Sequence, residues 1–162
     1  MKDKKVLAGG AVLVLALFWF YIKPNYMDAK PPPVYTEQQL AEAPKPTVKL
    51  EERVLNLKAP STAPNYVKTT IALEFSDPKH TYLGAKGAAI EAKDLAYAAD
   101  LKADMPRVWD AIIQVVGGKT ADQVSTPDGR DKLKTELIDA VNAKLDAGHK
   151  VQNIYFETFI TQ

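Results

Sequence analysis

The sequence contains no cysteine and only two histidines, His80 and His149, which lie far apart in the chain. Without cysteine the protein cannot form disulfides or use thiolate chemistry. Neither histidine has a second ligand at metal-binding spacing, and we expect both in loops. The chain also lacks an excess of charge of one sign, because 21 basic and 20 acidic residues give a net charge of +1. This balance argues against nucleic acid as a partner.

Catalytic motifs are also missing. The stretch GGKT, Gly117 to Thr120, has the letters that end a phosphate-binding loop, but Ile113 occupies the position of that motif's first glycine. These residues are instead typical of a helix C-terminus. The serines and threonines lack a visible base. We therefore predict that the protein is not an enzyme and that it uses no cofactor or metal.

A charge-free apolar run, VLAGGAVLVLALFWFYI from Val6 to Ile22, lies near the N-terminus. As a helix it would reach roughly 26 Å, the short end of a bilayer span. Its aromatic end suits the membrane interface. We predict a single N-terminal transmembrane helix, with the anchor residues Val6, Leu13, Leu17, Phe18, Trp19, Phe20, Tyr21 and Ile22.

The flanking charges predict the orientation of this anchor. Lys2, Lys4 and Lys5 precede the run, and the positive-inside rule then places the N-terminus in the cytoplasm. A cleaved signal peptide is the alternative, but small residues at a cleavage-site spacing do not follow the run. We favour an uncleaved inner-membrane anchor with the C-terminal domain on the extracytoplasmic, periplasmic side.

A proline-rich segment follows, with six of the chain's 11 prolines between residues 24 and 47. Such segments extend about 3.1 Å per residue and form stiff linkers. Within it, Thr36 and Gln39 have the spacing of a capping box, which predicts a turn or two of helix. That helix could be transient or a docking element. The predicted organisation is an anchor at 1–23, a linker at 24–47 and a folded domain at 48–162.

Period-two alternation predicts the strands of the domain. YVKTTIALEF, Tyr66 to Phe75, is the clearest strand. In VKLEERVLNL, residues 48–57, the alternation changes phase at Glu51 and Glu52, which predicts a bulge. The proline-containing loop between these segments predicts antiparallel neighbours. The terminal IYFETFITQ, Ile154 to Gln162, carries large apolar side chains in both phases, so we expect a buried strand in the middle of the sheet.

Helical periodicity occupies the region between the strands. Pro106 either starts a helix with Asp104 as its N-cap or kinks a longer helix that begins near Ala92, and Gly117 ends it. Trp109 lies beside the apolar stripe, which favours core packing over an exposed interface anchor. The stripe consists of Leu101, Met105, Val108, Ile112 and Val115 or Val116, widened by Ile113.

A second helix is predicted in STPDGRDKLKTELIDAVNAKLDAG, capped by Ser125 or Thr126, with Pro127 in its first turn and Gly148 beyond its end. Its polar face is solvated and could also make polar contacts between subunits. That face comprises Asp128, Arg130, Asp131, Lys132, Lys134, Glu136 and Asp139. Together the strands and helices predict a small α+β domain.

Three segments in this order resemble the FliL family of flagellar basal-body-associated proteins. They are YVKTTIALEF, residues 111–145 with the patterns KT and TP-G, and the terminal VQNIYFETFITQ. The resemblance implies a non-enzymatic inner-membrane protein whose outer domain is similar to the stomatin-like (SPFH) fold. It further implies homo-oligomeric rings around the flagellar stator, contacts with basal-body proteins, and support of motor torque and motility. A general inner-membrane SPFH-like scaffold or an envelope regulator without a flagellar role is the alternative.

Overall fold

A computed structural model describes residues 34–59 and 65–162 of the chain. The predicted anchor Val6–Ile22, its flanking lysines and most of the proline-rich linker lie outside these residues. Among the helices of the described part, none is both long and apolar enough to cross a membrane. From Glu37 to Gln162 the chain forms one compact unit.

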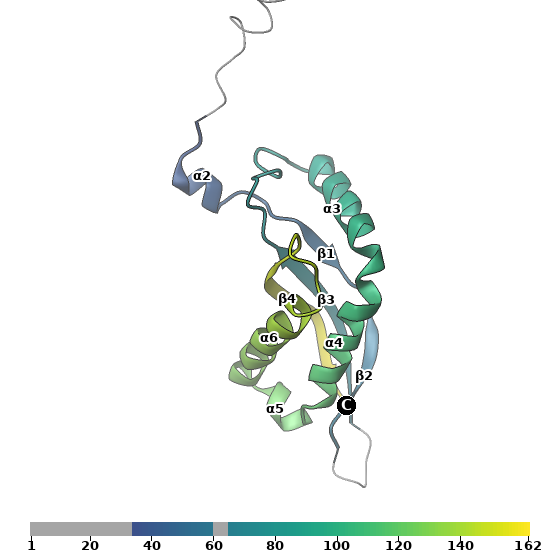
Figure 1. Cartoon of the computed structure of the whole chain (residues 1–162). Coiled ribbons are helices and arrows are strands. Elements are labelled where there is room, and N and C mark those ends of the chain that lie inside the picture. The colour runs from purple at the N-terminus through teal and green to yellow at the C-terminus, as the bar shows by residue number, and fades with distance from the viewer. Residues whose placement is uncertain (1–33, 60–64) are drawn as a thin grey trace, which may run out of the picture. The chain divides into compact units, whose positions relative to one another are not determined.

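Four strands form one antiparallel sheet: β1 (Thr47–Lys49), β2 (Arg53–Leu57), β3 (Asn65–Phe75) and β4 (Val151–Thr161). β3 is the central strand, because β1 and β2 follow each other along one of its edges while β4 pairs with the other edge. Figure 1 shows β4 lying along β3 over most of its length. The predicted antiparallel pairing of β2 with β3 is confirmed.

The expected central position of the terminal strand is wrong. β4 is an edge strand that pairs with β3 alone. Its two apolar faces differ in exposure, since Ile154 faces the core at 0% exposure whereas Tyr155 and Ile160 remain 43% and 50% exposed. β3 takes the middle because it is buried on both faces, with the small side chains of Thr70 and Ala72 on the face away from the core.

At Glu51 and Glu52, where the sequence predicted a bulge, the structure has a break between two strands. β1 ends at Lys49 and β2 begins at Arg53, and the Leu50 amide still donates to the Ile71 carbonyl at 2.8 Å. The three residues between the strands, Leu50, Glu51 and Glu52, let the chain change face. Leu50 and Leu55 are therefore both buried despite their odd spacing.

The helices are α2 (Glu37–Ala41), α3 (Ala88–Asp100), α4 (Met105–Gly117), α5 (Ala121–Ser125) and α6 (Pro127–Asn142), with a 3-10 turn at Leu101–Ala103. α2 is the short helix expected in the linker. α4 begins at Met105 with Asp104 at the N-cap and Pro106 in the first turn, so Pro106 starts the helix and does not kink a longer one.

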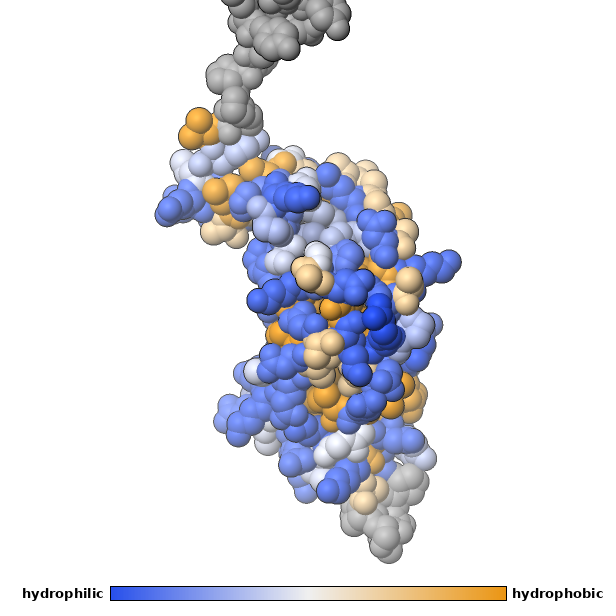
Figure 2. All heavy atoms as spheres, viewed as in Figure 1, coloured by the Kyte–Doolittle hydropathy of each residue, from blue (hydrophilic) through white to orange (hydrophobic). Residues whose placement is uncertain are grey.

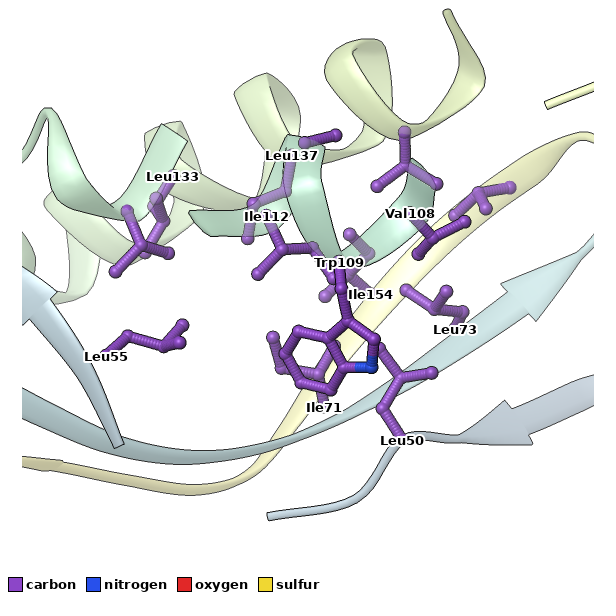
Figure 3. Packing of buried hydrophobic residues seen from close by; sticks show 14 of the residues in the cluster. Leu50, Leu55, Ile71, Leu73, Val108, Trp109, Ile112, Leu133, Leu137 and Ile154 are labelled. Atoms are coloured by element: carbon purple, nitrogen blue, oxygen red, sulfur yellow. The ribbon is translucent and has the colours of Figure 1, made fainter. Parts of the chain in front are cut away.

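The core lies between one face of the sheet and helices α4 and α6 (Figure 3). Full burial of each large aliphatic side chain contributes about 1.5 to 3 kcal/mol. The predicted stripe supplies the α4 side of this core, and Trp109 packs there at 7% exposure, as expected. Figure 3 shows these side chains from both layers: Leu50, Leu55, Ile71, Leu73, Val108, Trp109, Ile112, Leu133, Leu137 and Ile154.

The start of α6 follows from the TP-G pattern. Thr126 is its N-cap, and the Thr126 hydroxyl accepts a hydrogen bond from the Gly129 amide at 3.1 Å. Gly129 is required there because a Cβ atom at this position would lie 1.8 Å from the Gln123 carbonyl oxygen. This close approach joins α5 to α6 and sets the direction of α6 across the sheet.

Candidate interaction site

An apolar groove of about 710 Å³ lies between the β1–β2 edge and helices α3 and α4. We call it the Trp109 groove. Its lining is mainly hydrophobic, with charged side chains at the rim. The apolar residues are Val48, Leu50, Ala98, Met105, Pro106, Trp109 and Ile113, and the charged ones are Lys49, Glu51, Arg53, Lys102 and Asp110.

The break between β1 and β2 and the width of the α4 stripe together produce this groove. The chain leaves β1 after Lys49 and enters β2 at Arg53, and Leu50 and Arg53 line the groove beside Trp109. Ile113 lies one turn further along α4 and remains 47% exposed. The stripe is therefore wider than the sheet can cover, which leaves an apolar surface open to a partner.

Arg53 forms the charged wall beside Trp109. Its guanidinium carbon lies 4.0 Å from the centroid of the Trp109 ring, a cation–π contact. The same guanidinium donates from Nε to the Glu51 carboxylate at 2.9 Å. The Glu51 carboxylate thus fixes Arg53 across the indole, and the tryptophan presents a rigid, partly covered surface to the groove.

The remaining rim charges are of both signs. Lys49 lines the groove only at the sheet edge, because its side chain forms an ion pair with Glu157 of β4 on the sheet face away from the helices. Asp110 accepts a hydrogen bond from Gln114 at 2.8 Å. An apolar floor with a mixed polar rim is the usual composition of a protein–protein contact. The groove therefore suits apolar side chains of a protein segment.

A cluster of polar residues lies in the segment before α3 and in α3 itself. The Tyr82 ring is buried, and its hydroxyl lies near the Asp94 carboxylate without a partner at hydrogen-bonding geometry. Burial, with a contribution from Asp94, raises the pKa of Tyr82. Burial also acts to raise the pKa of Asp77, but hydrogen bonds from Thr81 and the Tyr82 amide outweigh it and lower that pKa. Because Asp94 also accepts from the Thr47 amide at 3.1 Å, this cluster holds α3 against β1.

The GGKT stretch has the capping role expected for it. Gly117 ends α4, and Thr120 caps α5 through a reciprocal capping box with Gln123. The Lys119 ammonium forms an ion pair with Glu136 at 2.6 Å. Among the described residues no cluster of His, Asp and Glu has the arrangement of a metal site. Both histidines lie outside helices and strands, as predicted.

The polar face predicted on α6 is divided by the fold. Its outer residues are exposed, whereas Arg130 and Lys134 are half-buried beside Phe156 and Phe159 of β4. Sequence reasoning did not find the Trp109 groove. The available signal was Ile113, which widens the apolar stripe of α4 and is 47% exposed in the structure.

Two comparisons with known proteins show what this chain is similar to. The family model for the flagellar basal body-associated protein FliL matches residues 47–162. The matched range begins at the first residue of β1 and includes all four strands. The chain is also 31% identical over 111 residues to the flagellar protein FliL of Aquifex aeolicus (strain VF5), an alignment that covers 65% of this chain and 68% of that protein.

Proposed function

Because this chain belongs to the FliL family of flagellar basal body-associated proteins, we propose that it is a membrane-anchored accessory protein of the flagellar motor. In this proposal it associates with the stator and supports motor torque. The observation that carries the proposal is the family match, which spans the entire sheet and the helices that cover it. The Trp109 groove adds a surface suited to protein contact and lacks a metal-binding cluster among the described residues.

The proposed location is the inner membrane, with the domain on the periplasmic side. The apolar run Val6–Ile22 and the preceding Lys2, Lys4 and Lys5 support this orientation. A periplasm-active reporter fused after Gln162 should be active, and the protein purified from membranes should retain Met1 or Lys2. An N-terminus near Pro24 would contradict the uncleaved anchor.

We further propose that several copies assemble into a ring around the stator. A single domain of this size offers little contact area, so repeated copies held at one membrane supply the required strength through avidity. The proline-rich linker would extend the domain tens of ångströms from the bilayer, at about 3.1 Å per residue.

Deletion of the gene tests the proposed function. We expect swimming to weaken more in viscous medium than in dilute medium, because torque support matters most under load. A fluorescent fusion to the intact chain should form spots at flagellar motors. Unchanged motility at every load, with a diffuse membrane signal in cells that build normal flagella, would instead support a general membrane scaffold.

A further inference from the structure

The two halves of β4 differ in how their outer edge is protected. β4 pairs with β3 along one edge, and no strand of the described residues pairs with the other. In the N-terminal half, asparagine side chains cover the outward backbone groups. Asn142 accepts from the Val151 N–H at 2.8 Å and donates to the Val151 carbonyl at 3.0 Å, and Asn153 accepts from the Ile154 N–H at 2.9 Å. Proteins usually protect sheet edges, because unpaired backbone groups recruit further strands.

The C-terminal half of β4 lacks such cover. Tyr66 and Gln162 exchange two hydrogen bonds of 2.9 Å each. In an antiparallel pair the bonded positions alternate, so the N–H and C=O groups of Phe159 and Thr161 point away from β3. Unlike the outward groups of the N-terminal half, they receive no hydrogen bond from a side chain of the described part of the chain. They are free to bond to an added strand.

A hollow of about 380 Å³ lies beside this free edge, between β4 and the N-terminal half of α6. The rings of Phe156 and Phe159, with centroids 4.8 Å apart, form its apolar part. Both rings are on the helix side of the sheet, since they lie opposite the buried Ile71 and Thr69. A strand added to the edge would direct every second side chain towards this hollow, because side chains alternate between the two faces of a sheet.

The charges of the hollow leave one cation without a partner. Asp131 forms an ion pair with Lys134 at 3.6 Å, so these two side chains balance each other. Arg130 lines the hollow and is half-buried, and within the described part of the chain its guanidinium has neither an ion pair nor a hydrogen bond. A side chain that enters the hollow therefore needs an apolar stem to cover the aromatic rings and a carboxylate to pair with Arg130. Glutamate has both.

The other face of the same edge is apolar. Ile160 lies on the sheet face away from the helices, in the row of Lys68, and its side chain is 50% exposed. On an added strand, the residues that alternate with the glutamates would lie beside Ile160. β-branched side chains suit this position, because apolar pairs on neighbouring strands stabilise a sheet. The edge thus fits a segment in which glutamate and β-branched residues alternate.

We propose that the C-terminal half of β4 accepts an extended segment of a different protein, in which acidic and β-branched residues alternate, as a further strand of the sheet. A glutamate of this segment pairs with Arg130. The proposal goes beyond the function proposed above, because it adds a second contact surface at the opposite edge of the sheet from the Trp109 groove. A second copy of this chain fits less well. Its β1–β2 edge is already bonded at Thr47 and Lys58, and a contact between two β4 edges would bring two Arg130 side chains together.

A defined peptide tests the proposal with the full chain in phosphatidylcholine nanodiscs. The probe is a fluorescently labelled peptide of sequence Thr-Val-Glu-Val-Glu-Val-Thr, and its fluorescence anisotropy measures binding. We expect saturable binding that empty nanodiscs do not give. The matched peptide Thr-Val-Val-Val-Glu-Glu-Thr has the same composition without the alternation and should bind several-fold more weakly. Absence of saturable binding by the alternating peptide would overturn the proposal, and so would equal binding of the two peptides.

Variants of the hollow test the charge pairing. Arg130→Gln should weaken binding of the alternating peptide several-fold. Lys132→Gln removes an exposed cation of the same helix outside the hollow and should leave binding unchanged. Glutamine in place of the peptide's glutamates should also weaken binding to the unaltered protein, but should have little further effect on Arg130→Gln, because the pair is already broken. Equal weakening by Arg130→Gln and Lys132→Gln would indicate non-specific attraction and contradict the assigned site.

Variants of Thr161 test the backbone pairing. Thr161→Pro removes an N–H group that points away from β3, a position where an edge strand tolerates proline, and it should weaken peptide binding several-fold. Thr161→Val keeps the N–H group and should bind as the unaltered protein does. Circular dichroism establishes that both variants are folded. Unchanged binding by Thr161→Pro would show that the peptide does not pair with the β4 edge.

A peptide of the chain's own segment Val151–Gln162 provides the last comparison. We expect it to bind several-fold more weakly than the alternating peptide. If it bound more tightly, the edge would select a second copy of this chain, and the proposal of a different protein would be wrong. None of these measurements uses motility, so the β4 edge can fail this test while the flagellar role stands.

Discussion

Arg53 lies over the ring of Trp109 with its guanidinium carbon 4.0 Å from the ring centroid, at the point where the sheet edge meets α4. Trp109 is only 7% exposed and also lines the groove. The same side chain therefore contributes to the stability of the core and to the shape of the groove. Residues of β2 and α4 that are far apart in sequence thus form one surface.

The first prediction concerns the energy of this contact. Trp109→Ala should lower the free energy of unfolding by about 3 to 5 kcal/mol, because it leaves a cavity under the groove. A double-mutant cycle with Arg53→Met and Trp109→Leu should give a coupling of about 0.5 to 2 kcal/mol. Urea unfolding of residues 37–162 measures both quantities. A coupling near zero would show that Arg53 and Trp109 do not stabilise each other.

The second prediction concerns the turn between α5 and α6. Gly129→Ala should destabilise the domain by at least about 2 kcal/mol, since the added Cβ would meet the Gln123 backbone at 1.8 Å. Gly148→Ala is the matched control, because nothing lies within 4 Å of a Cβ at that position. Thermal unfolding compares the two variants. Equal melting temperatures would show that α5 shifts freely relative to α6.

The third prediction concerns the end of the chain. Removal of Tyr155–Gln162 should abolish cooperative unfolding, because β4 pairs with β3 from Val67 to Phe75 and covers one edge of the central strand. Removal of Thr161 and Gln162 alone should be tolerated, since both are exposed. Circular dichroism during heating distinguishes the two truncations. A cooperative transition in the longer truncation would mean that the core does not require β4.

The fourth prediction concerns alkaline pH. Burial raises the pKa of Tyr97 to about 12, and the Tyr97 ring packs against Phe75 at 5.1 Å. Between the unfolded pKa of about 10 and the folded value the native state binds more protons than the unfolded state, so stability falls as pH rises through this window. Tyr97→Phe should flatten that fall. Urea midpoints from pH 9 to pH 12 measure the slope.

The sequence predicted the local elements well because each has a local signal. Thr126 and Pro127 mark the start of α6, Gly117 marks the end of α4, and the changed phase at Glu51 marks the break between β1 and β2. These signals come from residues only a few positions apart in the chain, so they can be recognised from the sequence alone.

Strand order and the groove could not be predicted in the same way. Apolar side chains in both phases of β4 suggested a central strand, yet the same pattern fits an edge strand whose outer face carries Tyr155 and Ile160 in the open. The order depends on which strand is covered on both faces by distant segments, and alternation contains no such information. The sequence also gave little indication of α3. None of its residues is buried, so it needs no strong apolar stripe.

The last prediction separates the groove from the fold. Ile113→Glu should leave the melting temperature nearly unchanged, because this side chain is already 47% exposed. It should nevertheless fail to restore motility in viscous medium to a deletion strain, since a carboxylate would be placed in the apolar lining of the Trp109 groove and would have to be desolvated on docking. Leu95→Glu makes the same change on α3 outside the groove lining, where the side chain is 73% exposed, and should restore motility fully. Immunoblots of membrane fractions establish that the two variants accumulate equally, and swimming speed across a viscosity series gives the comparison. Full restoration by Ile113→Glu at every viscosity would show that the groove has no part in the motor, whereas loss with both variants would point to a general effect of added negative charge.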